Sequence, residues 1–237
     1  METLFIVVPA YNEEANIENL VADWHPIVEK FGSDESKLVV IDDGSKDNTL
    51  SILRGLTDKY PKLLPLTKPN GGHGPTVLYG YRYAIDNGAD LIFQTDSDGQ
   101  TNPAEFEHFW EMRNDYDAIL GNRSDRQDVE SRKFVENTLR MLLKMIFHVS
   151  LPDANAPFRL MRADLVKKYI GKMPEDFNLP NVMFSTYFVY FKEKVAFEHV
   201  TFKPRQGGVN SINFKKIFKI GWKALSDFRY LKAHIDD

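Results

Sequence analysis

Residues 91–100 read LIFQTDSDGQ, a short apolar run followed directly by two aspartates, a glycine and a glutamine. The apolar residues Leu91–Phe93 predict a buried strand, and Asp96-Ser97-Asp98-Gly99-Gln100 predict a polar turn where that strand ends. In open α/β sheets, ligands bind beyond the carboxyl ends of the strands. This stretch therefore predicts both a strand of an α/β sheet and one wall of a binding cleft.

The same alternation extends outward along the chain. Further apolar strands are expected at Leu4–Val8, Leu38–Ile41, Leu63–Leu66 and Ala118–Leu120. Helical spacing of apolar residues separates them at 17–31, 50–56 and 76–86, and Asn102-Pro103-Ala104-Glu105 predicts a helix start. This order predicts an α/β fold with a mostly parallel sheet and helices on both faces.

The last third of the chain has a different pattern. Residues 135–149 follow an apolar helical pattern, residues 178–202 are rich in aromatic side chains, and residues 213–231 alternate apolar and basic positions. We interpret residues 1–212 as one catalytic domain. We interpret residues 213–237 as an amphipathic C-terminal helical extension rather than a separate domain.

The composition is that of a soluble globular protein. The 237 residues are 43% hydrophobic and 27% charged, which excludes a disordered chain, a collagen-like repeat and a coiled coil. The absence of cysteine excludes disulfides, thiolate metal sites and cysteine nucleophiles. No apolar run approaches the roughly 20 residues that span a bilayer, and the N-terminus lacks the basic region of a signal peptide.

The charge is distributed unevenly. The net charge is −4, yet residues 201–237 carry eight Lys or Arg and only three Asp. A basic tail on an acidic body predicts an anionic partner, such as phosphate, nucleic acid or lipid headgroups. A nucleic-acid partner is disfavoured, because the body is acidic and shows no recognition motif of that class.

Asp96, Asp98 and Gln100 form the most informative polar cluster. Two carboxylates and an amide oxygen at a strand end suit Mg²⁺ or Mn²⁺, which share oxygen ligands with substrate phosphates. The same residues also fit an ordinary turn.

Asp42-Asp43-Gly44-Ser45 is equally open to two interpretations. It predicts either contact with a nucleotide or a turn that caps the next helix.

Two further features suit phosphate. Asn70-Gly71-Gly72-His73-Gly74 lets the backbone approach a phosphate or sugar closely, and the lone His73 fits a structural role better than a catalytic one. Arg123, Arg126 and Arg132 follow the fifth strand, and arginine binds phosphate in a bidentate manner. A solvated basic helix start explains these arginines as well.

Taken in order, these motifs resemble the family-2 glycosyltransferases. The resemblance rests on Pro9-Ala10-Tyr11-Asn12-Glu13-Glu14, Asp42-Asp43-Gly44-Ser45, Asn70-x-Gly, Asp96-x-Asp98 and Gly121-x-Arg123, and it covers about residues 3–215. It implies the glycosyltransferase-A fold, a Rossmann-like fold that binds nucleotide sugars. Asp96-x-Asp98-x-Gln100, Asp153 with Phe158-Arg159, and Arg205-x-Gly207-Gly208 resemble the branch of dolichyl-phosphate mannose synthases and polyprenyl-phosphate sugar synthases.

The resemblance implies a role for individual residues. Asp98 and Gln100 ligate Mg²⁺ or Mn²⁺, and Asp96 lies near the ribose and the metal. The nucleotide is lined by Pro9, Tyr11, Glu13, Asp43 and Asp96. Phosphates of donor or acceptor are bound by Arg123, Arg132, Arg159 and Arg205. The catalytic group comprises Asp96, Asp98, Arg123 and Asp153.

The acceptor is inferred from what the sequence lacks. Relatives that glycosylate hydroxyls often carry a carboxylate near residues 178–182, but here that segment reads Asn178-Leu179-Pro180-Asn181-Val182. A phosphate acceptor is already anionic and needs no base, so we expect transfer to a polyprenyl phosphate, with inversion at the anomeric carbon. The alternatives are a glycan hydroxyl with Asp153 as base, and a non-catalytic nucleotide-binding module. Ala156-Pro157 replaces the branch's usual Ser-Gly.

Residues 213–231 also predict where the protein works. On a helix, Phe214, Phe218, Trp222 and Phe228 share an apolar face flanked by lysines, a pattern of helices that lie on anionic membranes. Packing of that face on the domain or on another subunit is the alternative, and a homo-oligomer stays open. The expectation is a cytoplasmic enzyme in peripheral contact with the inner face of the cytoplasmic membrane.

Overall fold

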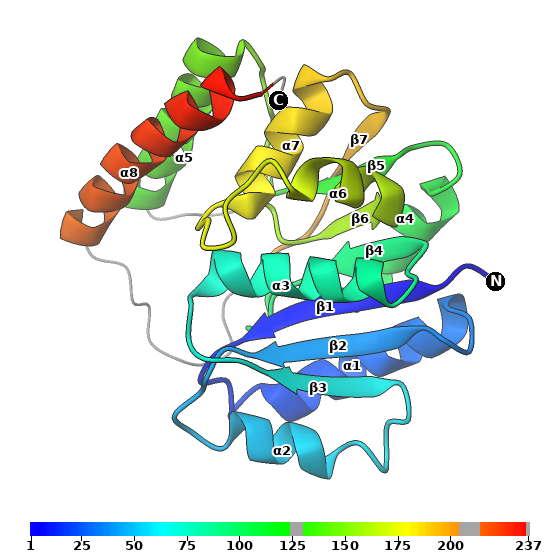
Figure 1. Cartoon of the computed structure of the whole chain (residues 1–237). Coiled ribbons are helices and arrows are strands. Elements are labelled where there is room, and N and C mark those ends of the chain that lie inside the picture. Colours follow the sequence, from blue (N-terminus) through cyan, green and yellow to red (C-terminus); the bar gives the residue numbers. More distant parts are fainter. Residues whose placement is uncertain (124–129, 204–213, 236–237) are drawn as a thin grey trace.

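The computed structural model describes residues 1–123, 130–203 and 214–235, with the side chains of 130–134 and 214–222 left out. A central sheet contains seven strands in the order β3-β2-β1-β4-β6-β5-β7 (Figure 1). The strands are β1 Leu4–Ala10, β2 Lys37–Asp42, β3 Leu63–Thr67, β4 Leu91–Gln94, β5 Ala118–Asn122, β6 Arg159–Arg162 and β7 Val195–His199. All five strands predicted from the sequence are present.

The sheet is mostly parallel, as predicted. Strand β1 pairs in parallel with β2 and β4, β2 with β3, and β5 with β7. Strand β6 is antiparallel to both β4 and β5 and lies between them. The parallel strands direct their carboxyl ends to one edge, so residues that follow β1, β2, β4 and β5 meet there.

Helices cover both faces of the sheet (Figure 1). They are α1 Ile17–Phe31, α2 Thr49–Gly55, α3 His73–Asp86, α4 Phe106–Met112, α5 Glu130–Phe147, α6 Ala163–Ile170, α7 Pro180–Tyr190 and α8 Phe214–Ala233, with a 3₁₀ turn at Pro103–Glu105. That turn begins as the sequence predicts: the Asn102 side chain accepts a hydrogen bond from the Ala104 N–H. The fold class is therefore confirmed.

The alternation of side chains along β1 explains the two layers. Leu4, Ile6 and Val8 pack with α1, α2 and α4 on one face, whereas Phe5 and Val7 pack with α3 and the C-terminal helices on the other. Every residue of β1 is buried, as expected for a central strand of a parallel sheet. The two hydrophobic cores, one on each face of the sheet, hold in place the strands whose carboxyl ends carry the polar loops.

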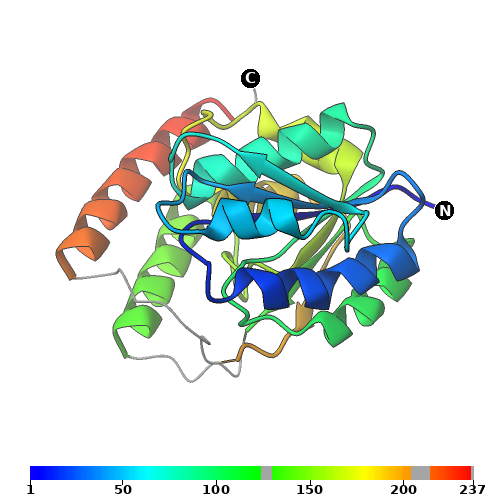
Figure 2. The same ribbon diagram turned by 90° about the horizontal axis from the view of Figure 1, so that it is seen from below.

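Helices α5 and α8 lie side by side at one end of the molecule in both views (Figures 1 and 2). Phe228 of α8 is fully buried and its ring lies 6.3 Å from that of Phe147 in α5. The second half of the predicted amphipathic helix therefore packs on the domain, which was the alternative to membrane contact. Its first half, from Phe214 to Trp222, lies outside the described side chains.

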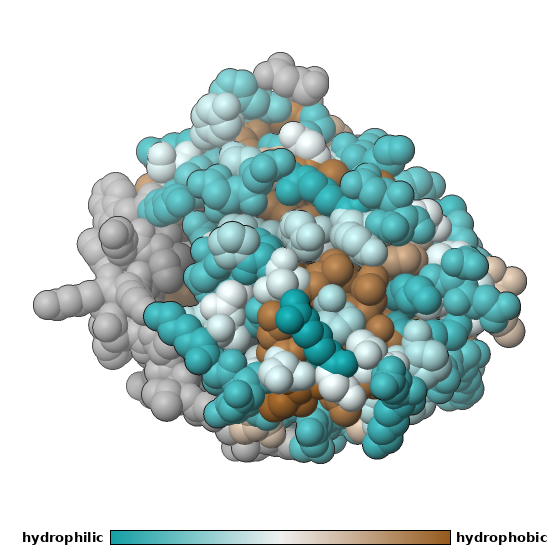
Figure 3. Space-filling view, turned by 60° about the horizontal axis from the view of Figure 1, so that its bottom comes forward, coloured by the Kyte–Doolittle hydropathy of each residue, from teal (hydrophilic) through white to brown (hydrophobic). Residues whose placement is uncertain are grey.

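The surface is largely hydrophilic on the face that Figure 3 shows, with apolar residues in patches between the polar ones. Among the described residues, none of the helices combines the length and apolar character that crossing a membrane requires.

Candidate nucleotide-sugar site

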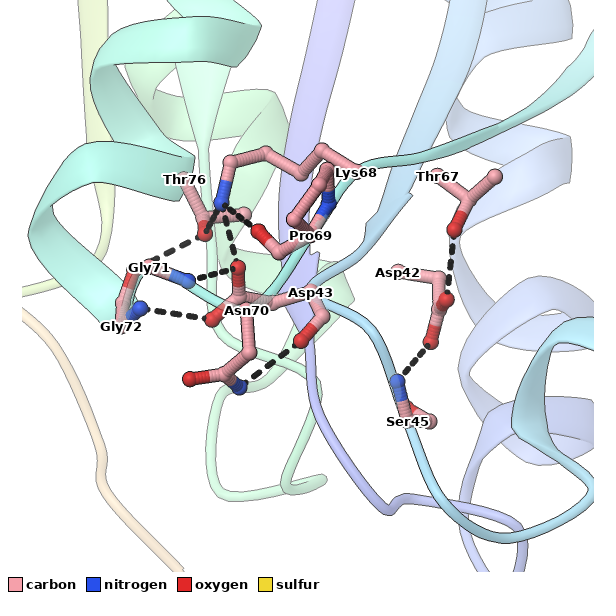
Figure 4. Close-up of polar contacts among 10 residues, drawn as sticks. All are labelled: Asp42, Asp43, Ser45, Thr67, Lys68, Pro69, Asn70, Gly71, Gly72 and Thr76. Atoms are coloured by element: carbon pink, nitrogen blue, oxygen red, sulfur yellow. Dashed lines mark hydrogen bonds and ion pairs between the residues drawn. The ribbon is translucent and has the colours of Figure 1, made fainter.

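The first wall of the candidate site is a carboxylate held by a glycine loop. Asp43 follows β2 and is buried, and its Oδ1 accepts the Gly71 N–H at 2.9 Å while its Oδ2 accepts the Gly72 N–H at 2.8 Å (Figure 4). The Lys68 ammonium also binds Oδ1. Gly72 has φ +91°, a conformation that favours glycine and turns its N–H toward Asp43.

This geometry changes the interpretation of two motifs. The glycine loop was expected to approach phosphate or sugar, but the N–H groups of Gly71 and Gly72 are bound to Asp43. The neighbouring Asp42 accepts hydrogen bonds from the Ser45 N–H at 3.0 Å and the Thr67 hydroxyl at 2.8 Å. Asp42 therefore stabilises the turn, whereas Asp43 organises the loop that leads into α3.

The residues after β1 form a second wall. Tyr11 is exposed, and Asn12 adopts φ +54°, where its N–H donates to the Ser45 hydroxyl at 2.9 Å. Glu13 is buried and accepts the Asn16 side-chain amide at 2.8 Å. Pro9 lies within β1, beside Ile41 of β2. Pro9, Tyr11, Glu13 and Asp43 thus lie on or shortly after the adjacent strands β1 and β2, whereas Asp96, the fifth predicted nucleotide-lining residue, follows β4.

The loop after β4 carries the predicted metal ligands. The Asp98 carboxylate accepts the Gln100 N–H at 3.2 Å. Gln100 Nε2 donates to the Lys203 carbonyl at 2.8 Å, and the Lys203 N–H donates back to the Gln100 carbonyl at 2.8 Å. These bonds use the amide nitrogen of Gln100 and not its side-chain oxygen, the atom that the sequence predicts as a metal ligand. Two oxygen ligands from the protein fit Mg²⁺ or Mn²⁺, which usually complete their shell with substrate phosphates and water.

The described residues contain no cluster of three or more His, Asp or Glu side chains that could hold a metal ion. The assignment of Asp98 and Gln100 as metal ligands stays a prediction.

His73, for which the sequence favoured a structural role, lies beside the loop that carries the predicted metal ligands. Its Nε2 lies 3.0 Å from Asp96 Oδ1, which also accepts the Gln94 side-chain amide at 3.2 Å. Burial opposes protonation of His73, but the carboxylates of Asp96, Asp98 and Asp43 outweigh it and raise its pKa. The signal was its position directly after the glycine loop, which places it at the first turn of α3.

A buried ion pair follows β5. Arg123 Nε lies 2.7 Å from Asp153 Oδ2, and Nη2 lies 3.1 Å from Oδ1, so the guanidinium binds the carboxylate at two points. The two side chains are 9% and 11% exposed. Burial alone would raise the pKa of Asp153, but the Arg123 contacts dominate and lower it. A carboxylate of lowered pKa in a bidentate pair is a weak general base.

The remaining predicted arginines differ in their placement. Arg159 is fully buried, and its guanidinium donates to the carbonyls of Ala156 and Asn181 rather than facing the cleft. The prediction that Arg159 binds phosphate directly is therefore corrected, because its donors are already used inside the core. Arg132 lies in the first turn of α5, but its side chain lies outside the described residues, as does the whole of Arg205.

Comparison with known proteins identifies the family of this chain. The family model "Glycosyl transferase family 2" matches residues 5–170. Two curated relatives are an undecaprenyl-phosphate 4-deoxy-4-formamido-L-arabinose transferase of Pectobacterium atrosepticum and a dolichyl-phosphate beta-glucosyltransferase of Trichomonas vaginalis. The first is 23% identical over 229 residues, which are 95% of this chain and 67% of the relative. The second is 28% identical over 178 residues, which are 68% and 52%.

Solved structures share the architecture. Glucosyl-3-phosphoglycerate synthase of Mycobacterium tuberculosis, crystallised with Mn²⁺, uridine diphosphate and phosphoglyceric acid, superimposes with a TM-score of 0.71 at 15% identity. The match covers 98% of this chain and 78% of that one. S. aureus TarS superimposes at 0.61 and 18% identity, over 95% of this chain and 65% of that one. The expected glycosyltransferase-A fold is confirmed.

The chain spans between half and two thirds of the length of these curated relatives. The family model alone covers more than half of the chain, and its range contains the strand-end loops after β1, β2, β4 and β5. This chain belongs to glycosyl transferase family 2.

Proposed function

We propose that the protein transfers a sugar from a nucleotide-diphosphate sugar to a polyprenyl phosphate, with inversion at the anomeric carbon. The proposal is carried by the Arg123–Asp153 pair. The one carboxylate that the sequence offered as a base is bound at two points by an arginine and has a lowered pKa. An acceptor phosphate ionises without help and needs no such base, whereas a sugar hydroxyl does. Two curated relatives are named for transfer to polyprenyl phosphates.

The donor would lie across the carboxyl ends of β1, β2 and β4. Tyr11, Glu13 and Asp43 would line the base and ribose, and Asp96, oriented by His73 and Gln94, would contact the ribose. Asp98 and Gln100 would hold Mg²⁺ or Mn²⁺, which as a Lewis acid neutralises charge on the leaving diphosphate.

The acceptor phosphate would bind at the arginine side of the cleft. Asp153 binds Arg123 through Nε and Nη2, and Glu136 lies 3.9 Å from Nη2; an acceptor phosphate would bind the guanidinium alongside these carboxylates. Arg132 and Arg205 would add to this positive side, as their motif positions imply. In this proposal the donor side would be formed mainly by carboxylates, and the arginines would add positive charge to the acceptor side.

We further propose that the α5–α8 pair faces an anionic membrane, which places the enzyme at the inner face of the cytoplasmic membrane. Met141 and Met145 lie one turn apart on α5 and are 55% and 61% exposed. Arg140 and Lys144 accompany them on the exposed side. Exposed apolar residues beside basic ones suit the headgroup region of anionic lipids, and Phe228 is excluded from this contact by its burial.

The decisive experiment is a transfer assay. Purified protein is incubated with UDP- and GDP-sugars, Mn²⁺ and either undecaprenyl phosphate or a hydroxyl-bearing glycolipid in detergent. We expect a sugar-phosphate-lipid product, and none with Asp98→Asn. Transfer to the glycolipid alone would replace the acceptor assignment, and nucleotide binding without any transfer or donor hydrolysis would support the non-catalytic alternative.

A liposome assay tests the membrane contact. Sedimentation with anionic and neutral vesicles at low salt should show binding only to anionic vesicles, and less of it for Met141→Glu/Met145→Glu. Equal recovery in the supernatant with both vesicles would remove the membrane role. Glu111→Gln, an exposed change on α4 away from α5, is the matched control.

A further inference from the structure

Arg159 is a buried cation whose contacts are all neutral. Its Nε and Nη2 donate to the Ala156 carbonyl at 3.2 and 2.9 Å, and Nη1 donates to the Asn181 carbonyl at 3.1 Å. Nη2 also lies 3.4 Å from the Ser185 hydroxyl. The residue has no exposed surface, and no carboxylate of the described residues forms an ion pair with it. Buried charges are normally paired, so this arrangement needs an explanation.

The position of Arg159 places this charge near the loop that follows β4. Arg159 begins β6 and lies directly opposite Gln94, the last residue of β4. Opposed residues of an antiparallel pair project from the same face of the sheet, so the two buried side chains share one layer. The Gln94 amide donates to Asp96 at the site. The positive charge therefore lies one residue layer below the donor side.

The contacts of Arg159 also reach the acceptor side. Ala156 belongs to the turn that begins at Asp153, the partner of Arg123, and Asn181 lies in the first turn of α7. The Ser185 hydroxyl lies 3.1 Å from the Ala154 carbonyl and 2.9 Å from the Asn181 carbonyl. This network fixes the guanidinium between the Asp153 turn and α7, so its charge is held in one place.

The nearby carboxylates do not cancel this charge by contact. Asp153 is engaged by Arg123, and Asp96 by His73 and Gln94. Burial lowers the pKa of Arg159 and the charge of Arg123 adds to this, while Tyr81, Asp153 and Asp96 act to raise it. In a poorly solvated interior such a charge acts over a longer range than it does in water.

We propose that Arg159 is a positioning residue that supplies a fixed positive charge under the predicted donor site. This charge strengthens binding of the diphosphate part of the donor more than binding of its uncharged nucleoside part. It acts through the Gln94–Asp96 side of the site and touches no ligand. This inference rests on the proposed function, because it presumes a nucleotide diphosphate in the cleft. It assigns to a fully buried side chain a contribution to anion affinity.

The test compares charge and shape. Arg159→Gln removes the positive charge and keeps hydrogen-bonding groups. Arg159→Lys keeps the charge but loses the planar guanidinium. Arg162→Gln, on the same strand, is the surface control. Calorimetry with Mn²⁺ first shows whether the wild type binds UDP or GDP more tightly. It then measures the Kd of that diphosphate and of the matching nucleoside for each variant. Melting temperatures report folding.

We expect Arg159→Gln to weaken diphosphate binding about tenfold and nucleoside binding less than twofold. Arg159→Lys should stay within about threefold of the wild type for both ligands, and Arg162→Gln should change neither. Diphosphate affinity unchanged in Arg159→Gln, or an equal loss for both ligands, would overturn the inference.

If Arg159→Gln does not fold, Arg159→Lys decides. A tenfold diphosphate-specific loss in a variant that keeps the charge would overturn the inference, and retained affinity supports it. A wild type that binds neither UDP nor GDP would instead overturn the proposed function, so the two failures are distinguishable.

Discussion

His73 and Asp96 come from different elements, yet His73 Nε2 lies 3.0 Å from Asp96 Oδ1. His73 begins α3 after the glycine loop, and Asp96 follows β4, so the contact joins the loop around Asp43 to the predicted metal loop. The contact also brings to the site a histidine whose pKa is raised, against the effect of desolvation, by the neighbouring carboxylates.

This contact predicts a pH-dependent contribution to stability. Because Asp96 raises the pKa of His73 in the folded state, the contribution is complete below about pH 6.5 and is lost as the pH rises through the raised pKa. His73 is half exposed, so we expect only about 0.5 kcal/mol. NMR titration should show the His73 ring pKa above the unfolded value in the wild type and lower in Asp96→Asn. An unchanged pKa in that variant would contradict the contact.

Asp98→Asn tests the metal ligand. We expect the melting temperature without ligand to stay near that of the wild type, because Asp98 lies in a surface loop, and the Mn²⁺-dependent part of nucleotide affinity to disappear. Calorimetry with and without Mn²⁺ measures it. Asp115→Asn is the matched control, an exposed aspartate before β5 at the opposite edge of the sheet. Metal-dependent affinity that survives in Asp98→Asn would remove this residue from the metal site.

Asp153→Asn separates an orienting carboxylate from a base. Removing Asp153 from this buried pair leaves Arg123 with the more distant Glu136 carboxylate, 3.9 Å from Nη2, so we expect a loss of about 3 kcal/mol in the free energy of unfolding. Asp164→Asn, which disrupts the exposed pair with Arg162, should cost less than about 1 kcal/mol. In the transfer assay we expect the KM for the lipid phosphate to rise more than kcat falls. A collapse of kcat with unchanged KM would restore Asp153 as a base.

Gly74 tests the close approach of α3 to the loop before α7. A Cβ added at Gly74 would lie 2.3 Å from the Phe177 carbonyl oxygen and 2.6 Å from backbone atoms of Asn178. Because those neighbours are backbone atoms, Gly74→Ala should cost about 2 kcal/mol or more in chemical denaturation. Gly55→Ala, where nothing lies within 4 Å and the backbone is helical, should be stabilising by about 0.5 kcal/mol. Equal effects in the two variants would refute this packing.

The sequence predicted the regular half of the fold because its signals are local. Continuous apolar runs fix β1, β2 and β4, and the residues after each run are polar. Strand β6 was missed, since its four residues begin and end with arginine and only its neighbours make it a strand. Strand β7 was missed as well, inside a segment marked only by its aromatic residues.

The sequence predicted the residues of the candidate site more fully than the contacts among them. The strand-end positions of Asp43, Asp98 and Arg123 follow from the pattern of strands. That Asp43 binds the glycine loop, that Asp153 binds Arg123, and that Arg159 is buried depend on side chains far apart in the sequence. Those contacts are tertiary, and one sequence carries no direct signal for them.

The antiparallel strand β6 acts as a spacer in the working edge of the sheet. Without it, the ends of β4 and β5 would be neighbours about 5 Å apart, too close for the carboxylates after one and Arg123 after the other to avoid direct pairing. With β6 between them the ends are about 10 Å apart, which separates the carboxylates after β4 from Arg123 after β5. The reversed direction of β6 also brings residues 153–158 to this edge, so the same strand that opens the gap delivers the carboxylate that binds Arg123.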